Sequence, residues 1–97
     1  MNGKEIFTYL NEWAPEGIAW QKDSVGLQVG NPDVKIKNIL LSLDLTDKVI
    51  ENAIDEKCNL IITHHPLLFN PLRILDFSKN RTARMIEKLI KNNITLY

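Results

Sequence analysis

Apolar residues near the N-terminus recur every three or four positions, which is the spacing of one buried helix face. This pattern predicts an amphipathic helix over residues 3–13. Asn2 can cap its first turn, and Pro15 marks its end. The expected inward positions are Ile6, Phe7, Leu10 and Trp13.

Two strand patterns, one alternating and one continuous, follow this helix. Residues 25–29 alternate apolar residues with others, and the Gly-Asn-Pro sequence after them predicts a turn. Residues 34–45 begin with the same alternation and end in a continuous apolar run, and residues 58–63 form a second run. Continuous runs of this kind predict strands that are buried on both faces of a sheet.

Two further amphipathic segments predict helices. Thr46 can cap the first, which carries Asp47 in its first turn, where the helix dipole favours an acidic residue. Ser78 or Thr82 can cap the second, which extends to about Lys91. The expected inward residues are Val49, Ile50, Ala53 and Ile54 in the first helix and Ala83, Ile86, Leu89 and Ile90 in the second.

The order of these elements predicts the fold class. Residues 66–76 contain two prolines and are expected to form a loop, residues 92–93 suit the end of the last helix, and residues 94–97 begin a third strand. This alternation predicts a single α/β domain over residues 1–97, in which βαβ units form two or three layers around a largely parallel sheet. Functional sites in such sheets usually form beyond the carboxyl ends of the strands.

The composition narrows the classes of function. The fractions of hydrophobic residues (44%) and charged residues (25%) are those of an ordinary globular chain. Twelve basic residues balance twelve acidic ones, so we expect no binding to nucleic acid or to an anionic membrane surface. The apolar runs are too short to span a bilayer, and the N-terminus lacks the hydrophobic block of a signal peptide. The single cysteine, Cys58, suits a reducing compartment, so we expect the cytoplasm.

Two adjacent histidines, His64 and His65, follow the second apolar run at the expected carboxyl edge of the sheet. Imidazole binds zinc, iron, copper or nickel, and Pro66 stiffens the backbone after the pair. Neighbours on a regular strand point to opposite faces, so the pair suits two ions, or one ion and one hydrogen-bond partner, unless the backbone turns. The alternative is that both histidines lie at a loop mouth and bond to backbone or water.

Two aspartates are further candidates for a functional site. Asp44 could be a metal ligand, a partner that orients a histidine or, most simply, a cap or turn residue before the next helix. Asp23 is interpreted first as a turn residue and second as a functional carboxylate. Gly26 and Gly30 do not form a phosphate-binding loop, because no lysine follows them at the required spacing. Cys58 is interpreted as a small core residue and not as a nucleophile.

The segments "DSVGLQVGNP", "LSLDLT" and "NLIITHHPLLFNPLR" occur in this order and together resemble the Nif-three-like family. Its bacterial members are commonly labelled GTP cyclohydrolase 1 type 2 homologues. The resemblance implies an α/β fold with a dinuclear centre of divalent ions, zinc or iron, in which His64 and His65 each bind a different ion. It also implies a cytoplasmic, ring-like homo-oligomer, often a hexamer, and a nucleotide or other small-molecule substrate. One departure is Lys22, which stands where the family usually has a tryptophan.

The second departure concerns the remaining family ligands. They comprise a histidine- and aspartate-containing motif after the strand that matches residues 94–97, and a histidine and a glutamate near a distant C-terminus. None of these has a counterpart before Tyr97, so we expect the chain to be the N-terminal portion of a longer protein.

The resemblance therefore predicts the adjacent-histidine half of a dinuclear site that belongs to a metal-dependent hydrolase. The alternative is a non-catalytic interaction or assembly protein of the same family. In either case we expect this chain to be inactive alone. We also expect it to self-associate or to be only marginally stable, because it exposes a sheet edge or an apolar face.

Overall fold

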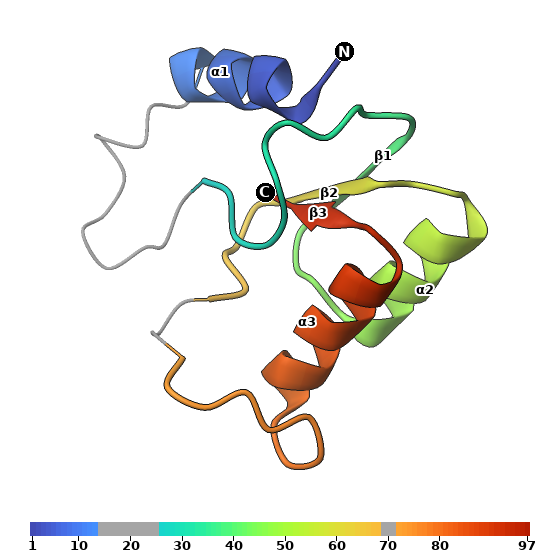
Figure 1. The fold of residues 1–97 in the computed structure, drawn as a ribbon. Coiled ribbons are helices and arrows are strands. Elements are labelled where there is room, and N and C mark those ends of the chain that lie inside the picture. The colour runs from blue at the N-terminus through green and yellow to red at the C-terminus, as the bar shows by residue number, and fades with distance from the viewer. Residues whose placement is uncertain (14–25, 69–71) are drawn as a thin grey trace.

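The structure is a computed structural model that describes residues 1–13, 26–68 and 72–97 (Figure 1). Its elements, in chain order, are α1 (Gly3–Trp13), β1 (Ile39–Ser42), α2 (Asp47–Asp55), β2 (Leu60–Thr63), α3 (Arg81–Lys91) and β3 (Thr95–Leu96). The strands form one parallel sheet in the order β1-β2-β3. Figure 1 shows α2 and α3 together on one side of the sheet and α1 on the other. The predicted α/β fold with a parallel sheet is confirmed.

Side-chain caps set the starts of the first two helices, as predicted. The Asn2 Oδ1 accepts a hydrogen bond from the Glu5 amide at 3.0 Å. The Thr46 Oγ1 accepts one from the Val49 amide at 3.1 Å. Each bond satisfies a backbone donor that the first turn of a helix leaves without an intrahelical partner. Within the described residues, no helix is long and apolar enough to cross a membrane.

The cap of α3 is Asn80, so the prediction of Ser78 or Thr82 was wrong. The Asn80 Oδ1 accepts a hydrogen bond from the Ala83 amide at 3.1 Å. Ser78 is engaged elsewhere, because its hydroxyl and its amide both donate to Asp76 Oδ1. These bonds, the side-chain bond first, lower the pKa of the Asp76 carboxyl. The loop before α3 is therefore closed by its own hydrogen bonds, and the helix begins at Arg81, three residues after Ser78.

The hydrophobic core lies between the sheet and the pair α2 and α3. Its buried members are Leu45, Ile50, Ala53, Cys58, Ile61, Met85, Leu89, Ile94 and Leu96. Two residues expected to point inward do not: Ile54 is 38% exposed and Ile90 is 62% exposed. Each directly follows a fully buried residue on its helix, and successive side chains of a helix lie about 100° apart. One sheet face therefore buries only a narrow stripe of each helix.

The edge strand β1 is covered on one face only. Leu40 packs against the core, whereas Ile39 is 43% exposed and Leu41 is 73% exposed. The prediction of burial on both faces was therefore wrong for β1. It holds for the start of the central strand β2, where Leu60 and Ile61 point to opposite faces and are both fully buried. The difference follows from the position in the sheet, because the α1 side covers β2 and β3.

The layer on the α1 side reaches β3 through two close contacts. The rings of Phe7 and Tyr97 stack with their centroids 4.6 Å apart. Gly30 has a φ of +119°, and a Cβ on it would lie 2.6 Å from the Thr95 Oγ1. Glycine at this position is thus required both by the backbone conformation and by the close approach.

A strand is predicted for residues 25–29, of which residue 25 lies outside the described part of the chain, and residues 26–29 form no continuous strand. Among these residues, Val29 makes an isolated antiparallel bridge with Leu96. The φ of Gly26 is +97°, outside the range of extended strands. Residues 26–29 therefore cross the outer edge of β3, where Gln28 and Val29 bond to the backbone of Leu96.

Replacing Asn80 with alanine should lower the free energy of unfolding by about 1 kcal/mol, because the Ala83 amide loses its acceptor. Thr82→Ala is the matched control and should change stability by less than about 0.5 kcal/mol. Urea unfolding followed by circular dichroism measures both. A larger loss for Thr82→Ala than for Asn80→Ala would contradict the cap assignment.

Candidate functional site

The pairing of β1 with β2 brings Asp44 and His65 side by side. Ser42 lies opposite Thr63 in the parallel register. Asp44 follows Ser42 by two positions, and His65 follows Thr63 by two positions. The pairing continues past the strand ends, since the His65 amide donates to the Leu43 carbonyl at 3.1 Å. The two functional candidates are thus placed by the register of the sheet.

Two hydroxyl groups bend both chains in the same way as they leave the sheet. The Ser42 hydroxyl donates to the Asp44 carbonyl at 2.8 Å, and the Thr63 hydroxyl donates to the His65 carbonyl at 2.8 Å. Side-chain bonds of this local kind replace the ladder at the end of a strand. A hydroxyl residue two positions before each candidate is the sequence signal by which this arrangement can be found.

The side chains of Asp44 and His65 are in direct contact. The Nδ1 of His65 lies 2.7 Å from the Oδ1 of Asp44, and each side chain is 56% exposed. A carboxylate only accepts hydrogen bonds, so this contact favours the tautomer with the proton on Nδ1, and in that tautomer the lone pair of the ring lies on Nε2. Asp44 is not the helix cap that its sequence position suggested, because Thr46 occupies that place.

The ring of His64 lies next to that of His65 instead of on the opposite face. The two ring centroids are 4.9 Å apart, and the ring planes are inclined by 59°. The strand ends at Thr63, so the alternation of a regular strand no longer applies to the pair. Within residues 1–13, 26–68 and 72–97, no hydrogen bond engages the His64 ring. Both rings can therefore serve one ion or two neighbouring ions.

The histidine pair offers donor atoms of the kind that bind metal ions. The exposed histidine rings offer two nitrogen donors, and imidazole nitrogen suits zinc and iron. Nowhere in the described ranges do three or more His, Cys, Asp or Glu residues gather so that they could hold a metal ion. The two histidines therefore have donors of the type that a divalent metal ion prefers. The described residues provide fewer ligands than the four of a closed structural site. Asp23, the remaining sequence candidate, lies outside the described residues.

Cys58 lies just before β2, at the amino edge of the sheet where the strands begin, and is buried. Burial, together with the negative charge of Glu56, raises the pKa of the Cys58 thiol. A thiol with a raised pKa yields little of the thiolate that acts as nucleophile or metal ligand. This environment agrees with the interpretation of Cys58 as a core residue.

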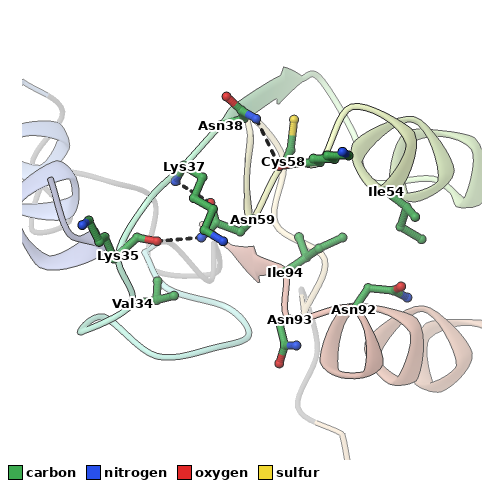
Figure 2. Close-up of a pocket in the computed structure, with 11 residues that line it drawn as sticks. Val34, Lys35, Lys37, Asn38, Ile54, Cys58, Asn59, Asn92, Asn93 and Ile94 are labelled. Atoms are coloured by element: carbon green, nitrogen blue, oxygen red, sulfur yellow. Dashed lines mark hydrogen bonds between the residues drawn. The ribbon is translucent and has the colours of Figure 1, made fainter.

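A cavity of about 710 Å³ lies at this amino edge and has three lysines, Lys35, Lys37 and Lys57, in its lining (Figure 2). Its asparagines bond to the backbone. Asn59 accepts from the Lys37 amide at 2.8 Å and donates to the Lys35 carbonyl at 2.7 Å, and Asn38 donates to the Lys57 carbonyl at 3.2 Å. These bonds tie the chain before β1 to the start of β2. The cavity therefore lies among residues that align the strands, at the end of the sheet opposite the histidines.

Replacing Asp44 with alanine should populate both neutral tautomers of His65, because the acceptor that holds the proton on Nδ1 is lost. Long-range ¹H–¹⁵N correlation spectra of the imidazole nitrogens measure the tautomers directly. Asp47→Ala removes the same charge from a residue that pairs with Lys88 and should leave the His65 tautomer unchanged. An unchanged tautomer in Asp44→Ala would show that the contact does not set the proton position.

Comparison with known proteins gives relatives over the whole chain. The family model of Duf34/NIF3 (NGG1p interacting factor 3) matches residues 1–97. A GTP cyclohydrolase 1 type 2 homolog from Listeria monocytogenes is 38% identical over 96 residues, which cover 99% of this chain and 26% of the relative. A homolog of the same name from Bacillus subtilis is 35% identical over 97 residues, which cover 100% of this chain and 26% of the relative. The chain therefore spans about a quarter of the length of these curated relatives.

Solved structures agree with this assignment. The crystal structure of a Bacillus cereus protein related to NIF3 superposes with a TM-score of 0.92 at 38% identity and covers 100% of this chain and 26% of that one. Reduced HcgD from Methanocaldococcus jannaschii superposes with a TM-score of 0.89 at 37% identity and covers 100% of this chain and 38% of that one. The resemblance noted in the sequence is confirmed, and the chain belongs to the DUF34/NIF3 family.

Proposed function

We propose that His64 and His65 are ligands of a divalent-metal centre, with zinc or iron as the ion, in a metal-dependent hydrolase. The observation that carries the proposal is the 2.7 Å contact between His65 Nδ1 and Asp44. Histidines that bind metals almost always donate their other ring nitrogen to a carboxylate, a carbonyl or water, which fixes the tautomer and the ring orientation. Here that partner is already in place, and the remaining nitrogen lies on an exposed ring.

Each polar residue at the carboxyl ends of β1 and β2 has a distinct role in this proposal. His64 and His65 supply imidazole nitrogens, and Asp44 keeps the proton of His65 on Nδ1. Ser42 and Thr63 hold the carbonyl groups of Asp44 and His65, so the backbone that carries the pair does not rotate freely. A bound divalent ion supplies Lewis-acid activation of water, which is the chemistry that hydrolysis requires.

The complete centre is proposed to be dinuclear, with one of the two histidines on each ion. Two imidazoles do not fill the coordination of two ions, so further ligands must come from residues other than the described ones. Curated relatives bear the name GTP cyclohydrolase 1 type 2 homolog, and a nucleotide or another small molecule is the proposed substrate. These statements concern the whole protein, of which the chain has the histidine half of the centre.

We further propose that the protein works as a homo-oligomer, with a ring-like hexamer as the expected form. The support is the open face of β1, where Ile39 and Leu41 are exposed at alternate positions, followed by the exposed Leu43 directly after the strand. Apolar side chains gathered on one face are typical of association surfaces. A reducing cytoplasm is the proposed location and suits the free thiol of Cys58.

Isothermal titration of the metal-free protein with Zn²⁺ should detect binding that His64→Ala/His65→Ala abolishes. Asp44→Ala should weaken the affinity by about 10- to 100-fold, because the orienting carboxylate is lost. Asp47→Ala is the charge-matched control and should bind as the wild type does. Undiminished Zn²⁺ binding in the double histidine variant would refute the ligand assignment.

Hydrolysis is tested on the natural gene product, at whatever length it is encoded, with GTP and other nucleotides as substrates. Turnover should disappear with a chelator, return with Zn²⁺ or Fe²⁺, and be absent in His65→Ala. Sedimentation velocity on the same samples should give one oligomer for the wild type and the variant. A stable oligomer without turnover in the metal-loaded wild type would instead support the non-catalytic assembly protein.

A further inference from the structure

A long-range hydrogen bond holds the loop that follows the histidines. The side-chain oxygen Oε1 of Gln28 accepts from the Leu68 amide at 3.0 Å, across 40 positions of the chain, in a partly buried setting. Leu68 lies only three positions after His65. The bond therefore links the "GLQVG" segment to the turn on which the histidine pair depends.

The backbone of Gln28 is bonded to that of β3. Its amide donates to the Leu96 carbonyl at 2.8 Å. The next residue, Val29, exchanges backbone bonds with Leu96 and packs against the core. The side chain of Gln28 thus extends from an anchored backbone toward the carboxyl edge of the sheet, where the histidines lie.

The turn between His65 and Leu68 is tied at both ends. The His65 carbonyl accepts from the Thr63 hydroxyl, and the Leu68 amide donates to Gln28. Between them, Pro66 has a restricted φ, and Leu67 packs against the core cluster. Leu43 and Asp44 hold His65 at the start of the turn. Gln28 bonds to Leu68 at the far end of the turn, so loss of Gln28 would free that end.

We infer that Gln28 is a positioning residue for the histidine pair and acts through the turn that contains Pro66. The inference rests on the proposed function, since the rings that it positions are the proposed ligands. Ligand orientation by outer groups is worth about 10- to 100-fold in metal affinity. Gln28 acts one step farther out than Asp44, so the effect expected of its loss is at the lower end, about tenfold.

Two substitutions separate the hydrogen bond from the bulk of the side chain. Gln28→Met keeps the length and removes the acceptor, whereas Gln28→Glu keeps an acceptor oxygen. Leu27→Met is the matched control, because it alters the neighbouring side chain and leaves the bond in place. The readouts are hydrogen exchange of the Leu68 amide, the imidazole ¹H–¹⁵N resonances of His64 and His65 without metal, and Zn²⁺ affinity.

In the wild type, the Leu68 amide should be protected from exchange. Gln28→Met should lose this protection, shift the resonances of both histidine rings and weaken Zn²⁺ binding about tenfold. Gln28→Glu should keep the protection and the ring resonances, and Leu27→Met should match the wild type throughout.

Two results would overturn the inference. The first is free exchange of the Leu68 amide in the wild type, which needs no variant and is decisive even if Gln28→Met fails to fold. The second is loss of protection in Gln28→Met with unchanged ring resonances. Absence of Zn²⁺ binding by the wild type would defeat the proposed function, while the resonances of the metal-free protein still decide the role of Gln28.

Discussion

The register between β1 and β2 is the constraint on which the candidate site depends. It places Ser42 opposite Thr63, and two positions later it places Asp44 against His65. A slip of one residue would turn every side chain of one strand to the other face and separate this pair. The asparagine side chains at the amino edge oppose such a slip, since Asn59 holds the chain that enters β1. Alignment at the amino end of the strands thus preserves the contact between Asp44 and His65 at their carboxyl end.

The two faces of the sheet are not covered to the same extent, and they have different roles. The face toward α2 and α3 contains the core, whereas the opposite face is covered at β3 and open at β1. Gly30 is what permits close coverage of β3, because any side chain there would collide with Thr95. The same segment carries Gln28 to the turn after the histidines. Packing on β3 and support of the candidate site are therefore properties of one short stretch.

Local features of the fold could be predicted from the sequence, and features that depend on distant partners could not. Thr46 was identifiable as a cap because its partner lies three positions away. The cap of α3 is an exception, because the bond that engages the Ser78 hydroxyl comes from Asp76, only two positions away, and local spacing alone does not choose between Ser78 and Asn80. The histidines were identifiable as candidates by residue type, but the contact between Asp44 and His65 requires a register that no local pattern specifies. The exposure of one face of β1 likewise depends on the layer on the α1 side, which covers β2 and β3 and leaves β1 open.

The two ends of the described chain meet in a contact between aromatic rings. Phe7 in α1 stacks on Tyr97, so α1 gains this partner only after the last strand is in place. Closing so long a loop costs more conformational entropy than closing a contact within one βαβ unit. The Tyr97 carbonyl also accepts the amide of Thr63, directly before the histidines. During synthesis, the backbone beside the histidines therefore stays incompletely bonded until residue 97 has emerged from the ribosome.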